Sequence, residues 1–142
     1  MTDPTVAPID LDAWLEHVQT HGIKLGLTNT RRALNALGDP QRSYPSILVG
    51  GTNGKGSTVA FATAVLAAAG HRVGSTISPH LTAYRERFRI NGVPVSEEAL
   101  RAHAAQVHAV LTPIPELAQL TFFELGASMA LSLFAAEAVD VA

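Results

Sequence analysis

The stretch Val49–Val59 combines glycines, hydroxyl side chains and one lysine in the order VGGTNGKGSTV. This combination suits phosphate binding, because glycines let backbone N–H groups approach an anion closely and a lysine ammonium neutralises its charge. The stretch departs from the usual pattern G-x-x-x-x-G-K-[ST] at two positions. Val49 stands where the first glycine is expected, and Gly56 stands where a hydroxyl residue normally follows the lysine. A glycine-rich structural turn is the alternative interpretation, since tight turns need glycine for steric reasons.

The elements around this stretch favour the phosphate site. A short apolar run, Ser46–Gly50, predicts a buried strand before the loop, and residues 57–69 predict a helix after it. His71–Ile77 predicts a second strand, so the segment forms a βαβ unit with a parallel sheet. We expect this loop to bind nucleotide phosphates, with Lys55 reaching the β- and γ-phosphates. The predicted phosphate-binding residues are Gly51, Thr52, Asn53, Gly54, Lys55, Gly56, Ser57 and Thr58.

Helical patterns precede the predicted sheet. Asp10 or Asp12 is expected to cap a first helix. Thr28 or Asn29 is expected to cap a second helix, which continues to Leu37 and ends at a Gly-Asp-Pro sequence. Together with the βαβ unit, these helices predict an α/β domain.

Further elements follow the βαβ unit. Alternating residues around Asn91-Gly92 predict a β-hairpin. Ser96 opens a helix that continues to about Leu111, and residues 121–138 form the last long helix. Residues 139–142 have the pattern of the beginning of another strand, so we expect a chain that stops inside an α/β domain.

Composition limits the classes of function. The chain has 142 residues, a net charge of −2 and no cysteine. Nucleic-acid binding usually needs a concentrated basic surface, and the absence of cysteine excludes disulfides and thiolate metal sites. The N-terminus lacks the basic and apolar regions of a signal peptide. We therefore expect a soluble cytoplasmic domain that binds neither nucleic acid nor a membrane. We also expect a monomer whose partners are small molecules.

Three segments in order resemble the folylpolyglutamate synthase and dihydrofolate synthase branch of the Mur-ligase superfamily. Gly51–Ser57 is similar to the phosphate loop of that superfamily, and the glycine after Lys55 is typical of this branch. Ser78–Leu81 with Tyr84–Gly92 resembles the branch's SPHL…RERI.ING segment. Leu120–Glu124 resembles its LT-[FY]-F-E segment. The resemblance spans essentially the whole chain.

The resemblance implies a fold and a reaction. The fold is α/β, a P-loop parallel sheet with flanking helices like the central domain of Mur ligases, here truncated. Residues 1–142 would be the N-terminal part of the ATP-binding domain, without the rest of that domain and without the C-terminal glutamate-binding domain. The implied reaction is ATP-dependent ligation of L-glutamate to dihydropteroate or folate polyglutamate through an acyl phosphate. ATP and Mg²⁺ are the implied cofactors, Lys55 is the catalytic residue, and this chain alone is expected to be inactive.

The metal assignment also follows from the resemblance. Gly56 has no hydroxyl with which to ligate Mg²⁺, and the resemblance transfers one ligand position to Ser78. An ordinary strand-ending turn is the alternative for Ser78-Pro79. A carboxylate ligand would come from a glutamate beyond the present chain.

The resemblance further implies a pterin pocket. Its predicted lining residues are Ile23, Lys24, Leu25, Gly26, Leu120 and Thr121, with His80 as a further substrate contact. Core packing is the alternative for Leu25 and Leu120, and a local hydrogen bond is the alternative for His80. Phe122 and Phe123 could offer a face to a pterin ring or belong to the core.

Other polar residues receive structural interpretations. Glu124 could be a ligand or a charge that stabilises a helix N-terminus. His17 and His21 have zinc-like spacing, but without a third ligand we expect a solvated helix face. His71, His103 and His108 are expected at the surface. Arg85, Glu86, Arg87 and Arg89 form a charged run that is expected on an exposed edge hairpin. The resemblance implies a position near the substrate cleft for this run, without a single role for any of its residues.

Two other functions remain open at this stage. A peptidoglycan ligase of the Mur type would share the loop and the acyl-phosphate chemistry, but Gly56 and the segment Ser78–Leu81 argue against it. A nucleotide-binding module without catalysis is the alternative from a different class.

Overall fold

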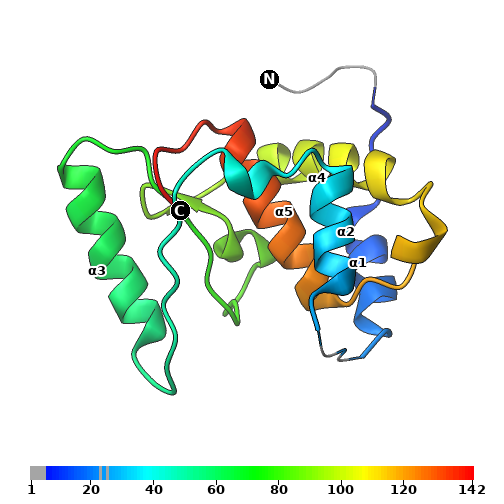
Figure 1. Cartoon of the computed structure of the whole chain (residues 1–142), viewed down its shortest axis with the longest axis horizontal. Coiled ribbons are helices and arrows are strands. Elements are labelled where there is room, and N and C mark those ends of the chain that lie inside the picture. Colours follow the sequence, from blue (N-terminus) through cyan, green and yellow to red (C-terminus); the bar gives the residue numbers. More distant parts are fainter. Residues whose placement is uncertain (1–5, 23, 25) are drawn as a thin grey trace.

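The computed structural model describes residues 6–22, 24 and 26–142 (Figure 1). Four helices pack together on one side of the molecule: α1 (Leu11–Gln19), α2 (Thr28–Ala36), α4 (Glu97–Leu111) and α5 (Phe122–Ala136). Helix α3 (Lys55–Ala68) lies apart from them on the other side. Between them lie the short strands β1 (Gly74–Ser75), β2 (Arg89–Ile90) and β3 (Val93–Pro94). Single 3₁₀ turns are η1 (Pro40–Arg42), η2 (Tyr84–Arg87) and η3 (Pro115–Leu117).

Side-chain caps determine where three of the helices begin. Asp10 accepts a hydrogen bond from the Ala13 N–H at 3.0 Å, and Ser96 accepts one from the Ala99 N–H at 3.1 Å. Thr121 caps α5 in the same way. These caps confirm the predicted starts of α1 and α4. The predicted cap of α2 is wrong, because Thr28 is already helical and Leu27 before it offers no polar side chain.

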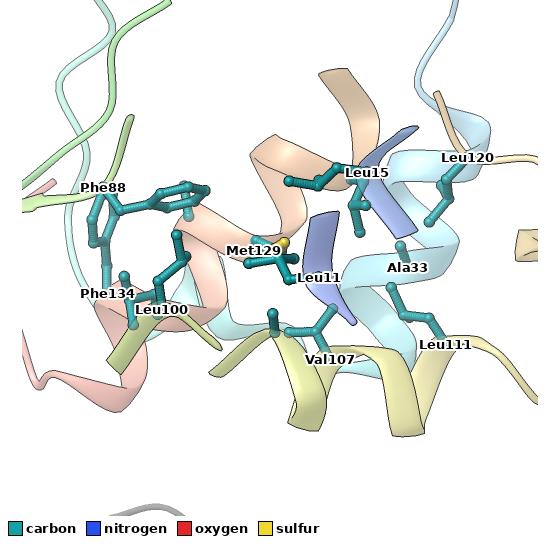
Figure 2. Close-up of a cluster of buried hydrophobic side chains, with 14 of the residues drawn as sticks. Leu11, Leu15, Ala33, Phe88, Leu100, Val107, Leu111, Leu120, Met129 and Phe134 are labelled. Atoms are coloured by element: carbon teal, nitrogen blue, oxygen red, sulfur yellow. The ribbon is translucent and has the colours of Figure 1, made fainter. Parts of the chain in front are cut away.

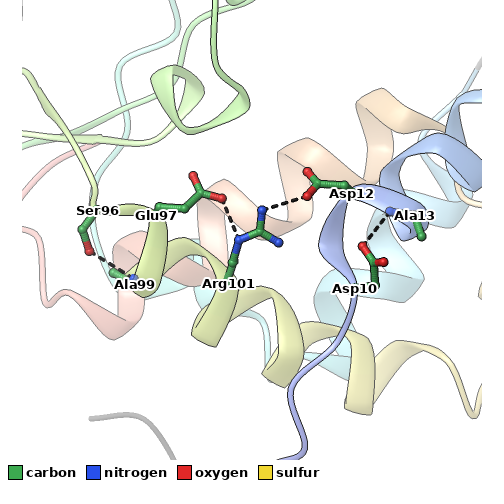
Figure 3. A network of polar contacts seen from close by, with 7 residues as sticks. All are labelled: Asp10, Asp12, Ala13, Ser96, Glu97, Ala99 and Arg101. Carbon is green, nitrogen blue, oxygen red and sulfur yellow. Dashed lines mark hydrogen bonds and ion pairs between the residues drawn. The ribbon is translucent and has the colours of Figure 1, made fainter.

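An ion-pair network joins α1 to α4 on their exposed side (Figure 3). Arg101 of α4 contacts Asp12 of α1 at 2.8 Å and Glu97, one helical turn earlier, at 2.8 Å. Exposed pairs of this kind contribute little to stability individually, so the packing beneath them must fix the helices.

That packing is a continuous apolar core (Figure 2). Helix α5 supplies its centre, with Leu125, Met129 and Phe134 almost completely buried. Phe88, from the segment between η2 and β2, is also completely buried. The core therefore joins the helices to the chain around the sheet.

The named strands form an antiparallel sheet in the order β1-β2-β3. The turn between β2 and β3 has Asn91 at φ 50° and Gly92 at φ 79°. Positive φ at both central positions is the conformation that favours Asn-Gly in two-residue hairpins. The predicted hairpin is confirmed.

The parallel part of the sheet is present but much shorter than predicted. Val73 forms a parallel bridge with Val141. The Ala142 N–H donates to the Pro45 carbonyl at 3.0 Å, and the Ile47 N–H donates to the Ala142 carbonyl at 2.8 Å. Residues 140–142 thus lie between the two segments that flank α3. The segment 46–50 is extended without forming a regular strand, because Ala142 is its only backbone partner among residues 6–22, 24 and 26–142.

Helix α3 exposes apolar side chains. Phe61 is 74% exposed and Val65 is 69% exposed, and Leu48 on the preceding segment is almost fully exposed. A cavity of about 240 Å³ separates α3 from β1 and α5.

Within the described ranges, none of the helices combines the length and the apolar composition that crossing a membrane requires.

His103 corrects one of the predictions. It was expected at the surface, but it is 7% exposed on α4, and its Nε2 lies 2.8 Å from the Ser132 hydroxyl of α5. Burial lowers its pKa from 6.5 to about 4, against smaller opposing effects of the Met129 carbonyl and Glu137. His71 is exposed as predicted, and His108 is half-buried against Trp14.

We predict that substituting Gly74 by alanine destabilises the fold. A Cβ at Gly74 would lie 2.6 Å from Cγ of Phe134, at the root of a buried ring that cannot move freely. The free energy of unfolding in urea should fall by about 1–3 kcal/mol. Gly50→Ala is the matched control, because a Cβ there meets nothing within 4 Å. Equal stability of both variants would show that the Gly74–Phe134 contact is not tight.

We also predict that acid weakens the fold through His103. The unfolded chain takes up a proton at this residue near pH 6.5, whereas the folded chain does so only near pH 4. The contribution of neutral, buried His103 to the free energy of unfolding is complete above pH 6.5. It falls by up to about 3 kcal/mol as the pH drops from 6.5 to about 4. Urea unfolding of His103→Gln should lack this part of the pH dependence, and His71→Gln should keep it. If both variants have the wild-type dependence, His103 does not cause it.

Candidate functional site

The predicted phosphate loop connects the extended segment 45–49 to α3. Gly51 has φ 151° and Gly54 has φ 77°. Gly54 is the N-cap residue of α3, in a left-handed conformation that costs glycine little. The helix therefore begins directly at Lys55, two residues earlier than predicted.

This loop is fully accessible. Every residue from Gly50 to Thr58 is exposed. The Lys55 ammonium folds back over the loop and donates to the carbonyl of Gly51 and, at 3.0 Å, to that of Thr52. The first N–H groups of a helix have no partner within it. The loop thus places a cation and free helical N–H groups at one exposed position, which suits an anion.

The hydroxyls of the loop differ in their availability. Thr58 donates its hydroxyl proton to the Gly54 carbonyl at 3.0 Å. This bond lies across the first turn of α3 and supports the left-handed N-cap. Thr52 and Asn53 are exposed in the loop, and Ser57 is exposed in the first turn of α3.

A second loop, residues 78–83, follows the extended chain after β1. Ser78 is exposed and is joined to Pro79 by a cis peptide bond. His80 is half-buried, and its Nδ1 accepts a hydrogen bond from Nε of Arg87 at 2.8 Å. Its ring packs edge-on against Tyr84 with 5.9 Å between centroids. The local hydrogen bond that was the alternative for His80 is thus present.

A cavity of about 190 Å³ lies between the first part of α3 and the chain that leads to the second loop. Gly56, from the first turn of α3, lies on one side of it, and Ile77, directly before Ser78, lies on the other. Arg89 also lines this cavity. The phosphate loop and the segment that leads to Ser78 are therefore neighbours across a small gap.

Glu86 holds the second loop. Its carboxylate accepts hydrogen bonds from the backbone N–H groups of Leu81, Thr82 and Ala83 and from the Thr82 hydroxyl. These hydrogen bonds lower the pKa of Glu86 to about 2, and the bond from the Thr82 hydroxyl contributes most. The carboxylate is consequently charged throughout the neutral range.

The predicted substrate segments lie next to each other. Nδ1 of His21 donates to the Leu120 carbonyl at 2.7 Å, and Nζ of Lys24 donates to the Gln119 carbonyl at 3.0 Å. These bonds connect parts of the chain almost a hundred residues apart. Ile23 and Leu25 lie outside the described residues. The structure therefore places the segment that contains Lys24 next to the segment that contains Leu120.

Individual side chains of this region have different surroundings. Leu120 is buried in the core, which agrees with the core packing considered as the alternative to a pocket position. Thr121 is buried and caps α5. Gly26 is exposed with φ 107°. His17 and His21 pack edge-on against each other, with 5.0 Å between ring centroids.

The two phenylalanines at the start of α5 have separate environments. The Phe122 ring lies 5.0 Å from the Arg87 guanidinium and packs against Tyr84. Phe123 is 69% exposed. Glu124 is 5% exposed and accepts a hydrogen bond from the Thr121 N–H at 2.8 Å, while Thr121 accepts one from the Glu124 N–H. This reciprocal capping box resolves the open interpretation of Glu124 in favour of the helix N-terminus.

The metal prediction can be tested against the side chains. In the part of the chain that the structure describes, the acidic and histidine side chains form no cluster of three that could hold a metal ion. The exposed Ser78 hydroxyl has no hydrogen-bond partner among these residues, so it can offer one oxygen ligand. Mg²⁺ is usually held by one or two protein groups together with phosphates and water, which fits such a partial site.

The sequence prediction missed the roles of Glu86 and Arg87. Both were assigned to an exposed charged hairpin, but they lie on η2 before the hairpin begins. A signal was present, since Glu86 stands three residues after the N-cap Ala83 and an acidic residue at that position can bond back to the N-cap N–H. Ala83 has no side-chain acceptor, so the Ser/Thr-x-x-Glu sequence of a capping box is absent and only the Glu86 half of the pattern could have been recognised.

Comparisons with known proteins give the family. No protein-family model matches the chain. A dihydrofolate synthase/folylpolyglutamate synthase of Bacillus subtilis is 36% identical over 128 residues, which is 89% of this chain and 30% of the relative. The chain belongs to the dihydrofolate synthase/folylpolyglutamate synthase family. It spans about 30% of the length of this relative.

Solved structures of this family have the same fold. The folylpolyglutamate synthase of Mycobacterium tuberculosis, complexed with ADP, has a TM-score of 0.85 and 35% identity, covering 92% of this chain and 30% of the other. The Yersinia pestis folylpolyglutamate synthase/dihydrofolate synthase, complexed with AMPPNP and a Mn ion, has a TM-score of 0.80 and 39% identity, covering 99% and 34%. These similarities confirm the predicted α/β fold class. They also show that folylpolyglutamate synthases bind nucleotides and a divalent metal.

Proposed function

We propose that this chain is the N-terminal part of the ATP-binding domain of a ligase that joins L-glutamate to dihydropteroate or to a folate polyglutamate tail. The observation that carries the proposal is the exposed glycine loop at the N-terminus of α3, over which Lys55 folds. The family membership supports the same function. The remainder of the ATP-binding domain and a glutamate-binding domain are required for the whole reaction.

The loop residues act on the transferred phosphoryl group. In the first step an oxygen of the acceptor carboxylate bonds to the γ-phosphorus of ATP, the bond to the bridging oxygen breaks, and ADP leaves. The backbone N–H groups of residues 51–57 hold the phosphates in line, and Lys55 neutralises charge on them. Lys55 must leave the carbonyls of Gly51 and Thr52 to do so, and these neutral acceptors are weaker partners than a phosphate.

The second step is formation of the amide. The amino nitrogen of L-glutamate attacks the carbonyl carbon of the acyl phosphate, phosphate leaves with the electron pair of the broken bond, and the nitrogen loses a proton. Activation therefore replaces a poor leaving group by phosphate, and no covalent bond to the protein is needed.

Ser78 is the proposed ligand from this chain to Mg²⁺. When bound, Mg²⁺ neutralises charge on the β- and γ-phosphates. The cavity shared by Gly56 and Ile77 supports placing Ser78 near the phosphates. The other ligands would be phosphate oxygens, water and a carboxylate from outside these residues.

The segments around Lys24 and Leu120 are the proposed pterin site. Two hydrogen bonds, from His21 to the Leu120 carbonyl and from Lys24 to the Gln119 carbonyl, hold these segments together, which supports the proposal. Gly26, Thr121, Ile23 and Leu25 belong to the same proposed lining, with His80 as a further substrate contact. Phe123 is the better candidate to stack on a pterin, because the Phe122 ring is already packed against Arg87 and Tyr84.

The exposed apolar side of α3 supports the domain assignment. Phe61, Val65 and Leu48 expose large apolar side chains near a cavity that borders the sheet. We assign to this face the rest of the ATP-binding domain, which would cover it in a longer protein.

We predict that Lys55→Ala weakens binding of Mg²⁺–ATP. Loss of a charge-assisted contact should cost about 1.5–3 kcal/mol, roughly tenfold to a hundredfold in affinity. Titration calorimetry measures this directly. Lys24→Ala is the matched control and should keep the wild-type affinity, because Lys24 bonds to Gln119, far along the chain from the loop. Full nucleotide affinity in Lys55→Ala would contradict the phosphate cradle.

We further predict that Phe123→Ala weakens binding of dihydropteroate. An aromatic stack contributes about 0.5–1.5 kcal/mol beyond buried area, so the dissociation constant should rise roughly twofold to tenfold. Phe61→Ala, which removes a similarly exposed ring from α3, should leave this constant unchanged. The measurement is fluorescence titration with dihydropteroate. An equal effect of both substitutions would exclude a specific stack on Phe123.

A further inference from the structure

The loop Ser78–Ala83 lacks regular secondary structure yet is held in one conformation. It connects the chain after β1 to η2 and contains both Ser78 and His80. Two neighbouring side chains on η2, Glu86 and Arg87, form hydrogen bonds to it. Their contacts account for every residue from His80 to Ala83.

The Glu86 carboxylate divides its bonds between its two oxygens. Oε1 accepts from the Thr82 N–H at 2.9 Å, the Thr82 hydroxyl at 2.6 Å and the Ala83 N–H at 2.8 Å. Oε2 accepts from the Leu81 N–H at 2.9 Å. Both oxygens act as acceptors, so an amide at this position would turn one of them into a donor that faces another donor.

Arg87 fixes the ring of His80. Its Nε donates to Nδ1 of His80 at 2.8 Å, while its guanidinium lies 5.0 Å from the Phe122 ring centroid and 5.7 Å from that of Tyr84. Because arginine has only donors, Nδ1 of His80 must be the acceptor and Nε2 carries the proton of the neutral ring. His80 therefore presents an N–H donor, which suits an anionic oxygen.

The two holding residues are themselves anchored. Arg89 donates to the Glu86 carbonyl at 3.0 Å. Phe88, directly after Arg87, is completely buried in the core, and its carbonyl accepts from the Val95 N–H at 2.9 Å. The loop is thus connected through η2 to the buried core.

We propose that Glu86 and Arg87 are positioning residues that hold the loop Ser78–Ala83 in the conformation in which Ser78 meets the metal–nucleotide complex and His80 donates from Nε2. The inference rests on the proposed function, because the role of Ser78 is part of it. It adds that the placement of these groups depends on two residues that touch neither metal nor nucleotide.

The test for Glu86 compares Glu86→Gln with Glu98→Gln, which removes the same charge from an exposed position on α4. Two quantities are measured for each variant and for the wild type: amide hydrogen exchange of Leu81, Thr82 and Ala83, and the affinity for ADP with and without Mn²⁺. Urea unfolding checks that both variants remain folded.

In Glu86→Gln, the three amides should exchange at least about tenfold faster, because they lose the acceptor that protects them from exchange. The gain in ADP affinity from Mn²⁺ should fall about fivefold or more, while the metal-free ADP affinity stays within about twofold, since the phosphate loop is intact. Glu98→Gln should match the wild type in both measurements. If Glu86 only stabilised the fold, Glu86→Gln would change the ADP affinity with and without Mn²⁺ to the same extent.

Arg87 is tested by the ¹⁵N chemical shifts of the His80 ring. The wild type should show the Nε2–H form, and Arg87→Gln should show a mixture of both neutral tautomers, while Arg85→Gln should resemble the wild type. An Nδ1–H ring in the wild type would overturn the assignment of His80 as a donor from Nε2.

Other outcomes also decide the proposal. Unchanged exchange of the three amides in Glu86→Gln would show that Glu86 does not hold the loop. Faster exchange with an unchanged Mn²⁺ effect would show that the held loop does not position a metal ligand. If the wild type binds ADP but gains nothing from Mn²⁺, the proposed metal site and the positioning role both fail, and the exchange rates still decide whether Glu86 holds the loop.

Discussion

The site depends on the backbone pairing of residues 140–142 with two segments that are distant in sequence. Val141 bridges Val73 in parallel, and Ala142 bonds to Pro45 and Ile47. Parallel segments have their carboxyl ends at the same edge, which is where ligands bind in open α/β sheets. The phosphate loop and the loop with Ser78 both leave from this edge. A few hydrogen bonds therefore bring the chains that lead into the two loops to the same edge, where Gly56 and Ile77 line one cavity.

The two loops are prepared in different ways. The phosphate loop is exposed and relies on glycine conformations and on the helix N-terminus, so its binding groups are mostly backbone atoms. The loop Ser78–Ala83 relies on a carboxylate and a guanidinium on η2, which the buried Phe88 connects to the core. A backbone cradle accepts phosphates of any nucleotide, whereas fixed side chains determine where a metal and a donor stand relative to them.

Local signals in the sequence predicted much of this arrangement. Ser96 and Thr121 begin their helices because a hydroxyl satisfies a free N–H, and Asn91-Gly92 turns the hairpin because both residues tolerate positive φ. Contacts between distant residues were not predictable in this way. His103 is buried because Ser132, on another helix, gives it a partner. The run Ser46–Gly50 is not a regular strand because, in the described part of the chain, its backbone pairs only with Ala142. Glu86 was missed because its partners lie in a loop whose path the sequence does not specify.

The central claim is that nucleotide phosphates and a divalent metal bind between the phosphate loop and the loop with Ser78. Paramagnetic broadening of backbone amide signals by Mn²⁺–ADP measures this directly, because broadening falls steeply with distance from the ion. We expect strong broadening for residues 51–58 and 76–81 together and little for the far end of α4 near Leu111. Broadening centred elsewhere, or at the phosphate loop without the loop around Ser78, would contradict it.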